Sequence, residues 1–141
     1  MPSHPGGAAS WSPPAQLAIA VGQPSFEAGL AFLARHPVPQ DSCYQYFKEA
    51  LIVWTITQSQ KWFLAKGVRM NCVAPGPVWT PLNVADKSAE QVAKHGSAQP
   101  MKRPAQPEEV APAFVFFASE ADSSYITGEV LTLLGGETAA G

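Results

Sequence analysis

The distribution of apolar residues along the chain predicts one long helix over residues 43–65. Tyr44, Phe47 and Leu51 recur at spacings of three and four residues, which places them on one stripe of an α-helix. Other apolar side chains fall on the remaining sides, a pattern typical of a helix that is buried on more than one face. Lys66 is followed by glycine, which is a common signal for the end of a helix.

Shorter patterns flank this helix. Residues 1–22 are rich in Pro, Gly, Ala and Ser and show no period, so we expect them to be disordered. Residues 23–141 are expected to form one domain. Within it the pattern predicts a helix over 25–35, a strand over 68–74, a polar segment over 81–99 with a short helix at 89–94, a helix over 107–118 that buries Val110, Phe114 and Phe117, and a strand over 129–134.

The order of these elements predicts an α/β fold. The long helix is followed by a short loop, a strand and then a loop that begins with Pro75, Gly76 and Pro77. In parallel sheets of this class, ligands bind outside the carboxyl ends of the strands. We therefore expect part of a doubly wound parallel sheet, with about two strands and two main helices, and a ligand site at this loop.

The charge content narrows the possible functions. The net charge is −2 and no basic cluster is present, so we expect no nucleic-acid partner. Only 14% of the residues are charged, compared with about a quarter in typical globular domains. This low content predicts that part of the surface is covered, by further strands or by partner subunits.

Cys43 and Cys72 lie in different predicted elements. They form no C-x-x-C pair and have no metal-ligand spacing with the histidines, so we predict no metal site. Small buried residues in a reduced protein are the simpler interpretation, which favours a cytoplasmic location. The first residues lack a cationic start before a long apolar segment, so we expect neither a signal peptide nor a membrane span.

Tyr44 and Lys48 are the first candidates for chemistry. They stand four residues apart and therefore share one face of the predicted helix. A neighbouring ammonium favours the phenolate and lowers the pKa of a tyrosine from about 10, which suits it to proton transfer. The competing interpretation is a surface lysine whose aliphatic stem covers the ring.

Four motifs follow one another along roughly the last hundred residues. They are Tyr44-x-x-x-Lys48, the segment Val68–Pro81 with its Pro75-Gly76-Pro77 loop, Arg103-Pro104-x-x-Pro107-Glu108-Glu109-Val110-Ala111, and Tyr125-Ile126-Thr127-Gly128 with Gly135-Gly136. Together and in this order they resemble the short-chain dehydrogenase/reductase family. The stretch from Phe26 to Trp54 also resembles the subgroup of coniferyl-alcohol and hydroxysteroid dehydrogenases.

The resemblance implies a Rossmann-type oxidoreductase that moves a hydride between NAD or NADP and an alcohol/carbonyl substrate. Tyr44 would transfer the proton, and Lys48 would hold the nicotinamide ribose and lower the pKa of Tyr44. Pro75, Gly76, Pro77 and Val78 would form the wall beside the nicotinamide, and Thr80 would reach the phosphate side. Residues 81–99 correspond to the mobile flap over the substrate. The substrate itself, and the choice of NAD or NADP, stay open.

Members of the family also use a serine to polarise the substrate carbonyl. Ser10 is our candidate, because Ala8-Ala9-Ser10-Trp11 resembles the end of the strand before the tyrosine helix. Ser12 and Ser42 are the alternatives. Phe47 departs from the family pattern, which usually has a small residue just before the lysine.

The glycine-rich turn Thr-Gly-x-x-x-Gly-x-Gly of the family is absent from this sequence. The sequence therefore resembles the C-terminal half of such an enzyme, without the βαβ half that binds the adenosine and phosphates. One alternative is a truncated, inactive chain that acts as an interaction or oligomerisation module, and another is a gene product without a stable fold. The resemblance implies a homo-oligomer that pairs through the 43–65 helix, and as an interaction module the chain could pair with a full-length relative.

Overall fold

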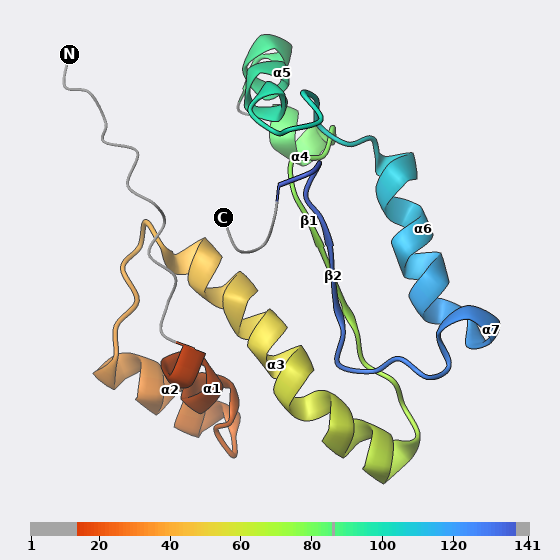
Figure 1. Ribbon diagram of the computed structural model, residues 1–141. Coiled ribbons are helices and arrows are strands. Elements are labelled where there is room, and N and C mark those ends of the chain that lie inside the picture. The colour runs from red at the N-terminus through yellow and green to blue at the C-terminus, as the bar shows by residue number, and fades with distance from the viewer. Residues whose placement is uncertain (1–13, 86, 138–141) are drawn as a thin grey trace. The chain divides into compact units, whose positions relative to one another are not determined.

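The computed structural model describes residues 14–85 and 87–137. The chain divides into two compact units, with the boundary along the sequence between Thr57 and Gln58, and each unit is described by itself. No helix in the described ranges is both long enough and apolar enough to cross a membrane. Figure 1 labels the elements: α1 (Pro14–Val21), α2 (Phe26–Arg35), α3 (Cys43–Lys66), β1 (Cys72–Pro75), α4 (Pro81–Val84), α5 (Ala89–Ser97), α6 (Pro107–Ala118), α7 (Glu120–Ser123) and β2 (Val130–Leu133).

The first unit packs α1 and α2 with the beginning of α3. Its core consists of Leu17, Tyr46 and Ala50, which are all buried. The structure differs from the predicted disorder at residues 14–21, because α1 occupies Pro14–Val21. Residues 1–13 of that prediction lie outside the described residues. The apolar side chain of Leu17 explains the difference, since burying it favours the ordered helix.

The helix α2 confirms the prediction for residues 25–35. Ser25 is its N-cap, and the Ser25 hydroxyl accepts a hydrogen bond from the N–H of Ala28 at 3.2 Å. Phe32 is buried on its inner face, and the ring of His36 stacks on Phe32 with centroids 4.3 Å apart. The helix ends at its C-cap residue His36, directly before Pro37, because proline disfavours helical backbone in the residue that precedes it.

The helix α3 confirms the predicted helix and ends before Gly67, whose φ is 64°. Its buried face differs from the predicted one. Tyr46 and Ala50 point into the core, whereas the apolar stripe of Tyr44, Phe47 and Leu51 is exposed. The expected burial on more than one face is therefore absent for this stripe.

The second unit contains a two-stranded sheet in which β1 and β2 run parallel (Figure 1). Cys72 pairs with Val130, and the register continues to Pro75 opposite Leu133. The predicted α/β class and the parallel pairing are confirmed. Both strands are shorter than predicted, since β1 begins four residues later than residue 68.

Side chains add to the backbone hydrogen bonds before β1, where the N–H of Gly128 donates to the carbonyl of Met70 at 2.7 Å. The Asn71 amide donates to the carbonyl of Ile126 at 3.1 Å and accepts from the N–H of Glu129 at 3.0 Å. The N–H of Met70 likewise donates to the Thr127 hydroxyl at 3.1 Å. These side-chain bonds satisfy part of the backbone without strand geometry, and β1 begins only at Cys72, later than the apolar pattern predicts.

The helix α6 confirms the predicted helix, but the prediction that all three of its apolar residues are buried is wrong for one of them. Val110 is buried and Phe117 is half-buried, as predicted, whereas 58% of Phe114 is exposed. Ala113 is the other buried residue of this helix. The buried strip is therefore narrow and follows the spacing of three and four residues from Val110.

Gly128 offers a test of packing in the second unit. Its φ of 81° is rare for other residues, and a β-carbon there would lie 2.6 Å from the Ser59 hydroxyl oxygen. We expect Gly128→Ala to lower the free energy of unfolding by more than about 1 kcal/mol, measured by urea denaturation. Gly29→Ala is the matched control, because a β-carbon at Gly29 meets nothing within 4 Å and alanine favours a helix by about 0.5–1 kcal/mol. Equal effects of the two changes would contradict this account.

Candidate active site

Tyr44 and Lys48 lie together on the first turns of α3. The Lys48 ammonium nitrogen is 5.5 Å from the centroid of the Tyr44 ring, within the range of a cation–π contact. The Tyr44 side chain is 74% exposed. The pair therefore presents a phenol and a positive charge side by side on one face of the helix, as their spacing predicts.

Tyr46 is the other tyrosine of this helix, and its environment differs. Its ring is buried, and its hydroxyl has no hydrogen-bond partner among the described residues. Burial raises the pKa of the Tyr46 phenol, because the charged form loses its hydration. Tyr46 is thus a core residue that stays protonated at neutral pH.

The loop after β1 belongs to the second unit, and a parallel bridge fixes its shape. The N–H of Ala105 donates to the carbonyl of Pro77, and the N–H of Trp79 donates to the carbonyl of Ala105. In a parallel bridge of this form, the N–H and C=O of Val78 point away from Ala105. Its carbonyl accepts a 2.6 Å hydrogen bond from the Asn83 amide, while its N–H has no partner within the described residues.

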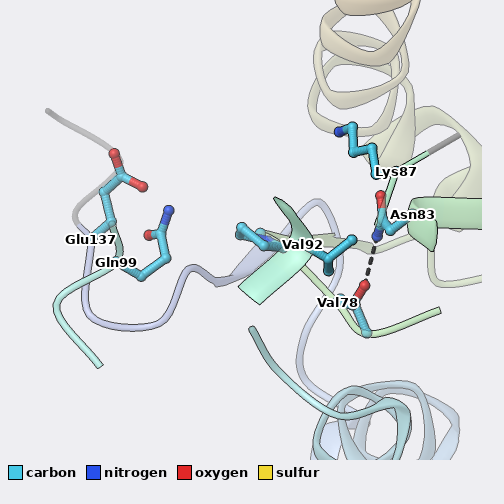
Figure 2. A pocket seen from close by; sticks show the side chains of 8 residues that line it. Val78, Asn83, Lys87, Val92, Gln99 and Glu137 are labelled. Carbon is cyan, nitrogen blue, oxygen red and sulfur yellow. Dashed lines mark hydrogen bonds between the residues drawn. The ribbon is translucent and has the colours of Figure 1, made fainter. Parts of the chain in front are cut away.

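A cavity of about 500 Å³ adjoins this loop. Figure 2 shows Gln99 and Glu137 on one side of its opening and Asn83 and Lys87 on the other, with Val92 between them. The lining therefore combines hydrogen-bonding groups with apolar walls, as small-molecule sites usually do. The lining residues are Gly76, Pro77, Val78, Asn83, Lys87, Val92, Gln99 and Glu137.

Thr80 stands at the N-cap of α4, beside the cavity residue Asn83. Its hydroxyl oxygen accepts a 3.3 Å hydrogen bond from the Asn83 amide. The hydroxyl proton of Thr80 is then available to a ligand oxygen, because that bond uses only an acceptor position. Asn83 thereby connects Val78 and Thr80, which are two of the residues predicted to bind the cofactor.

The predicted site residues thus fall into two groups. Tyr44 and Lys48 come together in the first unit, and Gly76, Pro77 and Val78 line the cavity of the second unit, with Pro75 exposed at the end of β1. The sequence-based candidates Ser10 and Ser12 lie outside the described residues. The third candidate, Ser42, donates its hydroxyl proton to the carboxylate of Asp41 at 3.2 Å.

Sequence reasoning missed several residues of the cavity. Asn83, Lys87 and Gln99 lie in the polar segment over 81–99, where polar residues are expected on any exposed loop. Only their position around the loop after β1 distinguishes them. Asn83 had the one usable signal, since it stands three residues after the cofactor candidate Thr80.

An ion pair joins Arg103 to Glu109 at the N-terminal end of α6, and the titration of its carboxyl group can be measured. Arg103 donates two hydrogen bonds to the Glu109 carboxylate, at 2.6 and 2.7 Å, and the N–H of Gln106 donates a third at 2.8 Å. These bonds lower the pKa of Glu109 from 4.5 to about 2, with the Arg103 bonds as the largest cause.

We expect the Glu109 carboxyl to titrate near pH 2 in an NMR experiment on the folded chain. Because the folded pKa is the lower one, the pair stabilises the fold above about pH 4.5, and this contribution is lost as the pH falls toward 2. Glu109→Gln should remove this part of the pH dependence of stability. Glu108→Gln, which leaves the pair intact, should not, and a normal midpoint for Glu109 would contradict the expectation.

The fold and the cavity define a class of protein: an α/β protein with a cavity at the carboxyl end of a parallel strand, which is where proteins of this class bind their ligands. The family model described as enoyl-(acyl carrier protein) reductase matches residues 29–138. The chain belongs to the short-chain dehydrogenase/reductase family.

Curated relatives share much of this sequence. Coniferyl-alcohol dehydrogenase of Pseudomonas sp. is 46% identical over 112 residues, which are 79% of this chain and 44% of the relative. NADPH-dependent aldehyde reductase 1 of Arabidopsis thaliana is 55% identical over 71 residues, which are 50% of this chain and 25% of the relative. The chain therefore spans less than half the length of these relatives.

Two solved structures that resemble this chain support its membership of the family. A candidate betaketoacyl-ACP reductase is 37% identical with a TM-score of 0.54, over 74% of this chain and 42% of that one. A short chain dehydrogenase from Bacillus anthracis is 29% identical with a TM-score of 0.51, over 63% of this chain and 34% of that one. Both place the fold within the Rossmann-type architecture.

Proposed function

We propose that this chain carries the proton-transfer and nicotinamide-side elements of an NAD(P)-dependent oxidoreductase that interconverts an alcohol and a carbonyl. The observation that carries the proposal is the Lys48 ammonium 5.5 Å from the centroid of the Tyr44 ring. A fixed cation beside a phenol stabilises the phenolate that proton transfer creates. The names of the relatives, an alcohol dehydrogenase and an aldehyde reductase, support the same substrate class.

Tyr44 is the acid/base group in this proposal. During reduction its hydroxyl gives a proton to the carbonyl oxygen of the substrate, and during oxidation its phenolate takes the proton of the alcohol. Lys48 stabilises the phenolate by its charge and binds the ribose hydroxyls of the cofactor. Ser10 is proposed to donate a hydrogen bond to the substrate oxygen.

The cavity of the second unit fits the nicotinamide end of the cofactor. The N–H of Val78, which has no partner among the described residues, is a donor for the carboxamide oxygen, and Gly76 and Pro77 line the adjoining wall, with Pro75 proposed beside them. The Thr80 hydroxyl can donate to an anionic oxygen on the phosphate side. When bound, the cofactor supplies the hydride acceptor or donor. Both NAD and NADP carry the groups with which these residues would form hydrogen bonds.

A second candidate function is an oligomerisation module. Phe47 and Leu51 are 46% and 54% exposed, and with Tyr44 they form an apolar stripe on α3. Exposed apolar stripes of this kind are typical of protein interfaces. In this alternative the stripe pairs with the same helix of a second copy, and the chain has no activity of its own.

Cofactor titration separates the two functions. The purified chain would be titrated with NADH and NADPH while nucleotide fluorescence is followed, and its mass would be measured by light scattering. Saturable binding in the micromolar range supports the oxidoreductase. A defined dimer that binds neither nucleotide contradicts it and supports the module. Broad aggregates would argue against both functions for the isolated chain.

A further inference from the structure

Lys87 brings a positive charge to the cavity beside β1. Among the described residues that line this cavity, it alone carries such a charge. Its side chain is exposed, and its ammonium forms no ion pair with the described part of the chain. A lysine of this kind can turn toward an anionic ligand on its flexible stem without first breaking an ion pair.

A neutral donor lies close to the same place. Figure 2 shows Lys87 beside Asn83, on one side of the opening. The Asn83 amide donates to the Thr80 hydroxyl oxygen at 3.3 Å, which leaves the hydroxyl proton of Thr80 available to a ligand. An ammonium and a hydroxyl proton, both next to Asn83, suit a ligand group that offers several acceptor oxygens and a negative charge. A phosphate has this chemistry.

The opposite side of the cavity carries the opposite charge. Glu137 lies there with Gln99, across the opening from Lys87 (Figure 2). An anionic group is therefore attracted toward Lys87 and repelled from Glu137, which orients a ligand that is negative at one end. The nicotinamide nucleotide matches this polarity, because its phosphate is negative and its ring is neutral when reduced and positive when oxidised.

We infer that Lys87 is a further cofactor-binding residue, which pairs with the phosphate next to the nicotinamide ribose. The inference rests on the proposed function for the identity of the ligand, and it adds a charged partner to the neutral donors of Val78 and Thr80. Hydrogen bonds that involve an ionised group are roughly twice as strong as those between neutral groups. Lys87 should therefore contribute most of the affinity for the phosphate.

The test compares nicotinamide mononucleotide with nicotinamide riboside, which differ by that one phosphate. Their affinities for the full chain would be measured by saturation-transfer NMR. We expect Lys87→Met, which removes the charge but keeps an extended side chain, to weaken mononucleotide binding about tenfold and to leave riboside binding unchanged. Lys87→Arg keeps the charge and should stay within about twofold of the parent chain.

Lys94→Met is the matched control. It removes the same charge from an exposed lysine of α5 that does not line the cavity, so it should leave the affinity for the mononucleotide unchanged. An equal loss in Lys94→Met would assign the effect to the net charge of the chain and overturn the inference. Losses in Lys87→Met that are equal for the mononucleotide and the riboside would also overturn it, because the phosphate would then play no part.

Two further measurements separate phosphate binding from stability. Lys87 is exposed and unpaired among the described residues, so the melting temperature of Lys87→Met should equal that of the parent chain. Raising the salt concentration should narrow the difference between the two probes in the parent chain, since salt screens exposed charges. A difference that ignores salt, or a tenfold loss in Lys87→Arg as well, would contradict a charge pair with the phosphate.

The outcomes distinguish this inference from the proposed function. Mononucleotide binding that depends on Lys87, in a chain whose Tyr44→Phe variant is as active as the parent, would support the phosphate site while the proposed proton transfer fails. Saturable NADH binding, together with mononucleotide binding that ignores Lys87, would have the opposite meaning. Absence of mononucleotide binding to the parent chain would overturn the inference, whatever the result with NADH.

Discussion

Replacing Tyr44 with phenylalanine is expected to lower the turnover of an alcohol or carbonyl substrate by about 10²–10⁴-fold. The change removes only the hydroxyl oxygen, so the ring contact with Lys48 remains possible while the transferable proton is lost. The affinity for NADH should change little, because the hydroxyl acts on the substrate oxygen in the proposed reaction. Steady-state rates of NADH oxidation, together with a fluorescence titration of NADH, measure both quantities.

Tyr46→Phe is the matched control for this experiment. It removes the same atom two residues away on α3, from a buried hydroxyl without a partner among the described residues. Activity should stay at the level of the parent chain, and the free energy of unfolding should be equal or slightly higher. A Tyr44→Phe chain as active as the Tyr46→Phe chain would rule out Tyr44 as the proton-transfer group.

Arg69→Met is expected to lower the free energy of unfolding by roughly 3 kcal/mol. The guanidinium donates to the carbonyls of Ser123, Ile126 and Phe117, at 2.8, 3.3 and 3.0 Å. It also donates to the Ser123 hydroxyl at 3.0 Å. These bonds join the segment before β1 to the end of α6 and to α7. Without them, partly buried carbonyls have no donor, and urea denaturation would measure the loss.

Two further variants test whether that loss of stability comes from the hydrogen bonds of Arg69. Arg69→Lys keeps the charge but lacks the planar fork that reaches several carbonyls at once, so we expect an intermediate effect. Arg35→Met removes a guanidinium that, within the described part of the chain, bonds only the carbonyl of Ala31 in its own helix, and it should cost less than about 0.5 kcal/mol. An Arg69→Met chain as stable as the Arg35→Met chain would show that the bonds of Arg69 contribute nothing.

Elements with strong local signals could be predicted from the sequence. The long apolar period and the Lys66-Gly67 ending define α3, and Pro107 with two following acids defines the start of α6. The proximity of Tyr44 and Lys48 also follows from local geometry alone, since a spacing of four residues fixes it in any helix.

Features that depend on contacts distant in sequence could not be predicted. The late start of β1 goes with bonds between Asn71 and residues more than fifty positions later. The exposure of Phe114 depends on how narrow a strip of α6 is covered. Gln99 carries no local signal, because only the fold places it at the cavity that Gly76 and Glu137 also line.

The register of the sheet has a consequence for synthesis of the chain. Cys72 pairs with Val130, so roughly 60 residues must leave the ribosome after β1 before its partner strand exists. At translation rates of about 5–20 residues per second, this interval lasts roughly 3–12 s. Throughout that time β1 exposes an unpaired edge to other nascent chains and to chaperones.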